Sequence, residues 1–537
     1  MAQPEFSSIR LVTPADQPSF DARNHGGDAS RKSGRHPRGL ADLLLARGHI
    51  NQDELAAALA LERHQDLGLA DLLLARGLIR EEDLLNLQAE FHRTRQISLI
   101  HAPFEPALTR KIRPTTAIRL SALPLRRVGR AMVVATSHPE NLPKIRSALD
   151  HDGPIILALA SRGDMRLALG RAFGDKLARQ AECLTPQPMS CRRWDGMKTA
   201  QFLLLALASL LACLALAPTA TAIALYGFAG LMFLTNTGLR LAVLGASMWR
   251  GRASRIDGIE AERAQMRPSP LWRRPVVSIF VPLFQEENIA GTLIEHLSKL
   301  DYPAELLDIM LIVEAGDTIT QDAIAACNLP PYFRAIIVPK GHPQTKPRAL
   351  NYALNYARGT IVGIYDAEDR PEPDQIWRVI RAFAAAPPDL ACVQGRLDYY
   401  NAAHNFMSRC FTLEYATWFR VMLPGIARLG LFVPLGGTTV FIRRDVLDEI
   451  GGWDAHNVTE DADLGLRLFR RGYRTELIDT TTFEEANSAV LPWIRQRSRW
   501  LKGYAMTWAT AMRNPRALMR DLGVWRFWGL QVQLIGA

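Results

Sequence analysis

Two long apolar runs near the middle of this 537-residue chain limit its fold more than any other feature. Residues 200–217 carry no charge, and neither do residues 219–239, which follow directly after Pro218. Each run is close to the ~20 residues that an α-helix needs to cross a bilayer. The pair predicts a tight transmembrane hairpin, which we assign to residues 200–244. A buried hairpin in a soluble core is the alternative, but soluble helices rarely run so far without a charge.

Basic residues flank this hairpin on both sides: Arg192, Arg193 and Lys198 before it, and Arg240, Arg250, Arg252 and Arg255 after it. Because basic flanks stay in the cytoplasm, both soluble regions are predicted to be cytoplasmic, at a bacterial inner membrane. A third apolar run at residues 524–537 predicts the start of a truncated membrane helix, and hence a multi-pass protein. Residues 1–37 are rich in Ser, Asp, Gly, Arg and Pro, which is typical of a disordered tail.

After the hairpin, apolar runs alternate with helical patterns. The runs at 276–282, 309–314, 335–339 and 361–366 are typical of buried parallel strands. This alternation predicts a doubly wound α/β domain over residues 275–520. Ligands of such domains bind at the carboxyl ends of the strands. Acidic residues gather at these ends: Glu286 and Glu287, then Glu314, then Asp366, Glu368 and Asp369.

Asp366 and Glu368 lie two residues apart where a strand leaves for a loop. Two carboxylates placed in this way can share one hard divalent cation, while water and phosphate oxygens fill its other positions. A solvated acidic turn is the alternative for this pattern taken alone.

Further polar motifs follow in a specific order. "TKPRALNYAL" supplies Lys346 and Arg348, two cations suited to a diphosphate. The others are "LGGTTVF" with Gly436 and Gly437, "VTEDADLGLRL" with Thr459, Glu460 and Asp461, and "QRSRW" at residues 496–500.

With these motifs, the chain from about residue 276 to its end resembles the cellulose-synthase-like, processive family 2 glycosyltransferases. The resemblance implies an α/β GT-A nucleotide-sugar domain plus transmembrane helices. It also implies a nucleotide-sugar donor such as a UDP-sugar, Mg²⁺ or Mn²⁺, a polysaccharide acceptor and membrane lipids, with no nucleic acid. The residues match as follows: Asp366 and Glu368 at the metal-binding DxD motif, Glu286 and Glu314 near the nucleoside, Lys346 near the diphosphate, Glu460 and the general base Asp461 in the TED motif, and Gln496, Arg499 and Trp500 beside the acceptor.

The motifs depart from the family pattern at two places. The usual DxD is DxE, so Asp369 could be the second carboxylate. The second strand ends in "VEAGD", so either Glu314 or Asp317 could face the nucleotide. Two other segments also keep alternatives. Trp500 either meets the acceptor or belongs to an interfacial aromatic belt, and residues 419–432 form either a helix on the membrane surface or a buried element.

A single base implies a displacement that inverts the anomeric centre. Asp461 lies just before an expected helix at residues 464–471. The positive end of the helix dipole is therefore expected to lower its pKa and keep it ionised.

The decapeptide "GLADLLLARG" occurs twice, at residues 39–48 and 68–77. Its leucines recur at helical spacing, and Gly48 and Gly77 supply left-handed stops. Asn51 and Glu54 form a capping-box pattern after the first copy. Two helix–turn–helix copies predict a small four-helix unit, which begins an α+β domain at residues 38–180.

This region resembles the N-terminal domain of type II secretion ATPases, some of which bind cyclic di-GMP through tandem helical motifs. Those motifs open with Arg-Leu-Gly and close in Gln, whereas Gly39 and Gly68 open the copies here and Glu62 and Phe91 close them. Arg38 is one residue out of register. We therefore expect the fold with, at most, weak cyclic di-GMP affinity. Because the chain has no GxxxxGK[ST] motif, the ATPase function is not implied.

The leading hypothesis is a membrane glycosyltransferase that builds an extracellular polysaccharide. A transferase of single sugars to a lipid carrier is the second, against which the intact Gln496, Arg499 and Trp500 argue. A non-catalytic membrane assembly or receptor component is the third, against which Asp366 and Asp461 argue.

Overall fold

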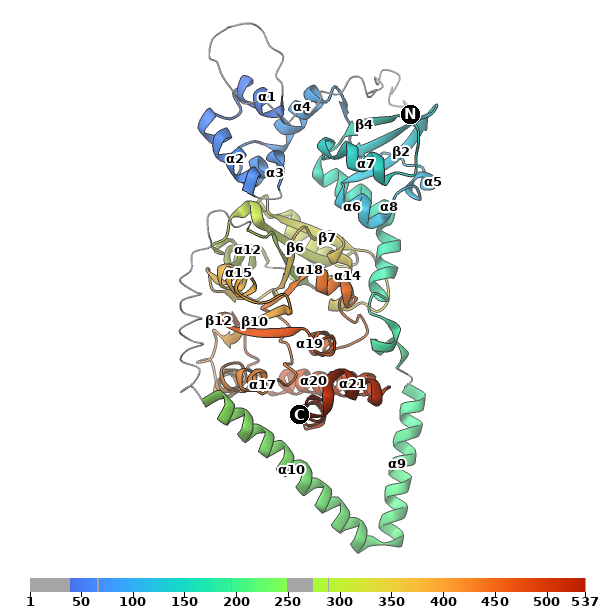
Figure 1. Ribbon diagram of the computed structural model, residues 1–537, viewed down its shortest axis with the longest axis vertical. Coiled ribbons are helices and arrows are strands. Elements are labelled where there is room, and N and C mark those ends of the chain that lie inside the picture. The colour runs from blue at the N-terminus through green and yellow to red at the C-terminus, as the bar shows by residue number, and fades with distance from the viewer. Residues whose placement is uncertain (1–38, 65–66, 195, 249–273, 288, 537) are drawn as a thin grey trace. The chain divides into compact units, whose positions relative to one another are not determined.

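The computed structural model describes residues 39–64, 67–194, 196–248, 274–287 and 289–536. They divide into two compact units, and Figure 1 shows their elements. The first contains the described residues up to Ala178, with Arg274 and Pro330–Tyr332, and the second contains the rest. The predicted tail at 1–37, together with Arg38, Arg250, Arg252 and Arg255, lies outside the described residues.

The repeated decapeptide folds into the same structure twice, as predicted. The four helices of the repeat are α1 (Leu40–Ala46), α2 (Gln52–His64), α3 (Leu69–Ala75) and α4 (Glu81–Phe91). Gly48 and Gly77 have positive φ angles of 71° and 67°, so each supplies the left-handed stop. The capping box is present: the Asn51 amide N–H donates to the Glu54 carboxylate at 2.9 Å, and the Glu54 amide N–H donates to the Asn51 side chain at 2.8 Å.

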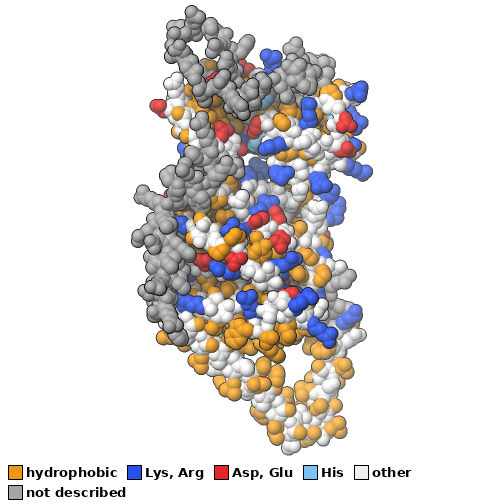
Figure 2. All heavy atoms as spheres, in the orientation of Figure 1, with side chains coloured by type: hydrophobic (Ala, Val, Ile, Leu, Met, Phe, Trp, Pro, Cys, Tyr) orange, Lys and Arg blue, Asp and Glu red, His pale blue; other side chains and the backbone are white. Residues whose placement is uncertain are grey.

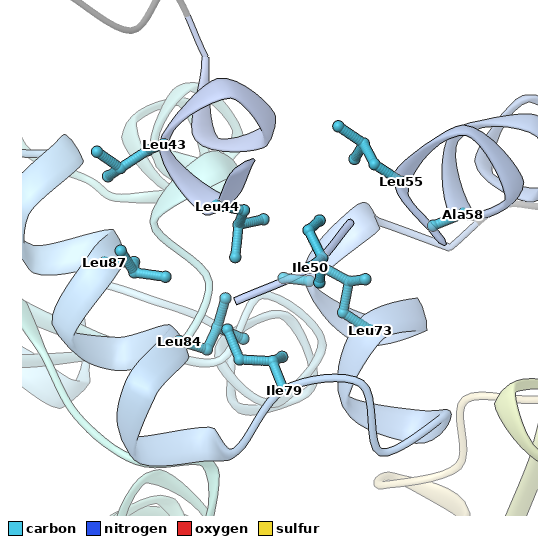
Figure 3. Packing of buried hydrophobic residues seen from close by; sticks show 10 residues of the cluster. Leu43, Leu44, Ile50, Leu55, Ala58, Leu73, Ile79, Leu84 and Leu87 are labelled. Atoms are coloured by element: carbon cyan, nitrogen blue, oxygen red, sulfur yellow. The ribbon is translucent and has the colours of Figure 1, made fainter. Parts of the chain in front are cut away.

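One apolar core holds the four helices together. Figure 3 shows Leu44 and Leu73, at equivalent positions of the two copies, pointing into the same cluster as Ile79, Leu84 and Leu87. Leu44 and Leu73 are fully buried. Because each copy has only one apolar face, the second copy supplies the surface that buries the first.

The second half of this unit is the predicted α+β part. Its four-stranded sheet has the order β1-β4-β3-β2, in which β2 and β3 form an antiparallel pair and the other neighbours are parallel. The elements are β1 (Arg95–Gln96), α5 (Pro106–Thr109), α6 (Pro114–Arg119), β2 (Ala122–Val128), β3 (Ala131–Thr136), α7 (Leu142–Ala148), β4 (Ile155–Leu159) and α8 (Arg162–Glu182).

Two long apolar helices occupy the predicted hairpin. They are α9 (Gly196–Leu216) and α10 (Pro218–Met248), joined at Ala217. Among the described helices, these two are long and apolar enough to cross a membrane. Figure 2 shows apolar side chains over both, and the most apolar window of each is entirely unburied within the protein. The two apolar runs therefore form helices that are exposed, and they are not buried as a hairpin in a soluble core would be.

An eight-stranded sheet organises the rest of the second unit, in the order β7-β6-β5-β8-β11-β10-β12-β9. The four predicted strands are confirmed and pair in parallel as β7-β6-β5-β8. The antiparallel β11 then joins β8 to β10, which the sequence did not predict. The strands are β5 (Val277–Leu283), β6 (Leu307–Glu314), β7 (Phe333–Val338), β8 (Ile361–Ile364), β9 (Arg370–Pro371), β10 (Leu390–Tyr399), β11 (Val440–Arg443) and β12 (Arg474–Glu484).

Helices lie between and after these strands along the chain: α12 (Ile289–Ser298), α13 (Thr318–Ala325), α14 (Lys346–Leu354), α15 (Gln375–Ala385), α16 (Phe406–Thr417), α17 (Leu423–Arg428), α18 (Arg444–Glu449), α19 (Glu460–Arg470), α20 (Val490–Ala511) and α21 (Pro515–Ile535). They include parts of the two other segments for which the sequence suggested contact with the membrane, residues 419–432 and the run from residue 524.

Residues 419–432 bury one face and expose Arg420 and Arg428, so the choice between a membrane-surface helix and a buried element stays open. A π-helical turn at Trp418–Met422 leads into α17, and Phe419, Leu423 and Ile426 pack in one cluster with Val243 of α10. The run from residue 524 forms the second half of α21, after a kink at Gly523 with φ 75°. Phe527, Leu530 and Leu534 are buried there against Leu518 and Phe432, while Trp525 and Trp528 are exposed. The described part of this run is thus amphipathic, and a membrane helix beginning there stays a prediction.

Candidate active site

Lys346 joins three of the predicted motifs at one point. It begins α14, and its Nζ donates to Asp366 Oδ1 at 2.5 Å and to the carbonyl oxygen of Gly437 at 3.1 Å. Burial lowers the pKa of Lys346, but Asp366 and Glu460 raise it more, so that the net shift is upward. The ammonium therefore stays charged at neutral pH.

The three acidic side chains of the loop after β8, Asp366, Glu368 and Asp369, differ in burial and in their contacts. Asp369 is fully buried and accepts hydrogen bonds from the Asp366 amide at 2.8 Å and from the Thr438 hydroxyl. Burial, and then the charge of Asp366, raise the pKa of Asp369 well above its usual range. Asp366 keeps about a third of its side chain exposed (35%), and Glu368 is exposed. Asp369 thus braces the loop, which leaves Asp366 and Glu368 as the accessible pair.

Asp461 lies in the first turn of α19, which begins at Glu460 rather than at residue 464. Its Oδ1 accepts a hydrogen bond from the Ala462 amide at 2.7 Å. The expectation of a lowered pKa is wrong: burial raises the pKa of Asp461 and outweighs the opposing amide hydrogen bonds and Lys346. Burial, followed by the charge of Asp461, raises the pKa of Glu460 to about 7.

Gly437 lets the backbone pass close to these charges. A Cβ atom added at Gly437 would lie 3.4 Å from Asp461 Oδ2 and 4.0 Å from Lys346 Nζ. Lys346 and Asp461, predicted from separate motifs, therefore lie beside the same short stretch of backbone, and Asp366 joins them through its ion pair with Lys346.

Glu314 and Asp317, the two candidates after the second strand, differ in their surroundings. Asp317 is buried and accepts backbone N–H bonds from Gln285 at 2.7 Å and from Thr320 at 3.1 Å, so it ties two loops together. Glu314 is paired with Arg348, whose Nη1 lies 3.0 Å from Oε1 and 3.3 Å from Oε2. Burial raises the pKa of Glu314, and Arg348 opposes this shift.

The expectation that Arg348 serves a diphosphate is wrong in this structure. Its side chain is fully buried and its charge is directed at Glu314. Glu286 is partly exposed, and its backbone N–H donates to the Thr320 hydroxyl at 2.9 Å.

The QxxRW residues lie on α20. Gln496 accepts a hydrogen bond from Asn487 at 2.9 Å, and Arg499 is exposed. Trp500 is partly buried and packs against Phe411 and Tyr415, each with ring centroids 6.5 Å away. Trp500 therefore belongs to an aromatic cluster inside the protein.

Two residues near this site were not predicted from the sequence. Glu484 ends β12, and burial, followed by Asp369 and Asp366, raises its pKa well above the usual range. The feature that could have identified Glu484 is its position as an acidic residue at the end of a strand, which it shares with Glu314. Tyr504 follows Trp500 by one helical turn, and burial, followed by Asp461, raises its pKa. Gly503 on the same helix approaches Thr459 so closely that an added Cβ would lie 2.3 Å from Oγ1, which brings α20 to the TED segment.

Comparisons with known proteins identify two domain families in the chain. Residues 361–535 match the family described as Glycosyl transferase family group 2, and residues 92–179 match the MshEN domain. The chain is 29% identical over 273 residues to a beta-monoglucosyldiacylglycerol synthase of Synechocystis, covering 48% of this chain and 55% of that protein. It is 24% identical over 262 residues to glucomannan 4-beta-mannosyltransferase 7 of Arabidopsis thaliana, covering 47% of each. The chain thus spans about half the length of these relatives.

Two solved structures are also similar. A mannosyltransferase from Pyrobaculum calidifontis, in complex with GDP-Man and Mn²⁺, is 19% identical with a TM-score of 0.38, covering 55% of this chain and 84% of that one. A structure of MshE with cdg is 26% identical with a TM-score of 0.23, covering 25% of this chain and 98% of that one. The family matches show that the chain carries a family 2 glycosyltransferase domain and an MshEN domain.

The raised pKa of Glu460 predicts a pH dependence of stability. Between pH ~4.5 and ~7 the folded state binds more protons at Glu460 than the unfolded state, so the free energy of unfolding falls as pH rises through this window. Glu460→Gln is expected to reduce this fall, as measured by melting temperatures from pH 5 to 8. The exposed Asp322→Asn serves as the control. An identical pH profile for wild type and Glu460→Gln would contradict the assignment.

Proposed function

We propose that this chain transfers a sugar from a nucleotide-sugar donor, such as a UDP-sugar, to a growing extracellular polysaccharide, with inversion at the anomeric carbon. The observation that carries the proposal is that Lys346 contacts both Asp366 and Gly437, and that Asp461 lies beside Gly437, within a family 2 glycosyltransferase domain. These are a cation for a diphosphate, a carboxylate for a metal and a carboxylate for a base.

Asp366 and Glu368 fit one Mg²⁺ or Mn²⁺ ion. Both are accessible oxygen ligands, and hard divalent cations prefer oxygen. Among the described residues, no group of three or more His, Cys, Asp and Glu side chains gathers as a ligand set, so donor phosphates and water would supply the other positions. When bound, the ion would neutralise charge on the leaving diphosphate.

Lys346 would bind the same diphosphate. Its ammonium already faces Asp366, so it lies next to the proposed metal ligand. Glu314 and Glu286, at the ends of their strands, would meet the nucleoside. Arg348 would act there indirectly, by holding Glu314.

Asp461 would accept the proton of the acceptor hydroxyl. Its raised pKa makes it a stronger base than an ordinary aspartate, and proton transfer is most efficient when the pKa of the base approaches the working pH. Glu460 next to it carries a pKa of about 7 and shares the site. The acceptor would approach past Gln496, Arg499 and Trp500.

The exposed apolar helices α9 and α10 support a place in the bacterial inner membrane. Their apolar surfaces would contact lipid, and the basic flanks would keep both soluble units in the cytoplasm.

Transfer of one sugar to a lipid is the second candidate function. The Synechocystis relative, whose name gives a glucosylated diacylglycerol as its product, favours it. The complete QxxRW motif and its aromatic surroundings favour the polysaccharide. The expectation of, at most, weak cyclic di-GMP affinity stays a prediction, because the MshEN match covers residues 92–179 and not the repeat at 39–91.

Donor turnover by the full-length protein in membranes tests the metal and the acceptor together. We expect release of nucleoside diphosphate from at least one nucleotide sugar, and its loss in EDTA and in Asp366→Ala. The exposed Asp322→Asn should keep wild-type turnover. Product length then separates a polymer from single transfer to lipid. Undiminished turnover in EDTA would exclude the metal-dependent site.

Asp461→Asn tests the base. The substitution keeps the size and a hydrogen-bond acceptor but cannot take a proton. We expect donor affinity near wild type and transfer reduced by roughly 10²-fold or more. Equal loss of donor binding and transfer would mean that Asp461 is structural or holds the metal, and normal transfer would make Glu460 the next candidate.

A further inference from the structure

One helix links the two family domains along the chain. α8 runs without interruption from Arg162 to Glu182, and its last four residues, from Arg179, belong to the second compact unit. The MshEN match ends at residue 179 and the glycosyltransferase match begins at residue 361. Glu182 therefore lies in neither match.

The end of α8 is tied to the segment around α14. Oε1 of Glu182 accepts a hydrogen bond from the His342 amide at 3.1 Å and lies 3.6 Å from Nε of Arg348. The carbonyl oxygen of Ala181 accepts a hydrogen bond from the Asn351 side chain at 3.0 Å. Two adjacent residues of α8 thus hold the loop before α14 and α14 itself.

Arg348 connects this helix end to the expected donor site. Its fully buried guanidinium lies between two carboxylates, Glu182 of α8 and Glu314 at the end of β6. Its Nε has no hydrogen-bond partner, since 3.6 Å is too long for one. A buried charge is costly unless it is paired, so the orientation of Arg348 depends on both carboxylates.

The loop around this triad leaves little room for another arrangement. A Cβ atom added at Gly341 would lie 2.3 Å from both Arg348 Nη2 and Glu182 Oε1. Glycine at this position lets the loop close over the ion pair.

We propose that Glu182 is a positioning residue of the donor site: it holds Arg348 in the orientation in which Arg348 fixes the Glu314 carboxylate for the nucleoside. Glu182 acts through Arg348 and does not touch the donor. The proposal rests on the proposed function, in which Glu314 meets the donor.

Glu182→Gln tests this role, since it removes the charge and keeps the shape. In the full-length protein with Mg²⁺, we expect the donor KM and the calorimetric Kd for UDP or GDP to rise ~5–10-fold, because Arg348 would hold the Glu314 carboxylate less firmly once its contact with the Glu182 charge is lost. The kcat should stay within about twofold, and the melting temperature should fall only slightly, because Arg348 keeps Glu314 as a charged partner. Asp175→Asn, which alters an exposed carboxylate on the same helix, should leave KM and kcat as in wild type. Glu182→Asp, which keeps the charge, should recover part of the affinity.

A double variant separates positioning from general damage. If Glu182 acts through Arg348 on Glu314, Glu182→Gln combined with Glu314→Gln should weaken binding no more than Glu314→Gln alone. The proposal would be overturned if the losses of affinity in the two single variants multiplied in the double variant. It would also be overturned if Glu182→Gln left KM and Kd unchanged, or if it lowered kcat and the melting temperature in parallel. A wild type that binds UDP or GDP but turns over no donor would refute the proposed function, while a weaker Kd in Glu182→Gln would still support this inference. A wild type that binds neither nucleotide would refute both.

Discussion

The ion pair between Lys346 and Asp366 is the interaction on which the arrangement of the site depends. It joins the start of α14 to the end of β8, and the same ammonium donates to the carbonyl oxygen of Gly437. Asp461 lies against Gly437 from the first turn of α19. One cation thus contacts residues up to 91 positions away in the sequence.

The carboxylates around Lys346 outnumber its single charge. Burial and mutual repulsion raise the pKa values of Asp369, Glu460, Asp461 and Glu484 together. Such a set is destabilised when it is fully ionised, and a second cation would relieve it. A divalent ion bound at Asp366, as proposed, would reduce this repulsion.

The sequence predicted those parts of the fold that local pattern determines. The decapeptide repeat formed matching helices, with Gly48 and Gly77 in the same left-handed conformation, because turn and helix chemistry act over a few residues. The four buried apolar runs formed parallel strands, so the acidic residues after them met at one edge.

The remaining features depended on contacts between distant segments. The direction of Arg348 depends on Glu182 and Glu314, far away in the chain, so its motif suggested the wrong partner. The pKa of Asp461 follows from burial, which the helix start alone does not reveal. Glu484 ends β12, a strand that the alternation of apolar runs did not predict. It was therefore not identified among the acidic residues at strand ends.

Calorimetric binding of UDP and GDP, with Mg²⁺ present, to full-length Lys346→Gln tests the central claim most directly. The claim that Lys346 organises a diphosphate site predicts affinity weaker by ~10-fold or more, because a charge-assisted contact is lost. The exposed Lys299→Gln should bind as wild type does. Unchanged nucleotide affinity in Lys346→Gln, with an unchanged melting temperature, would contradict the account.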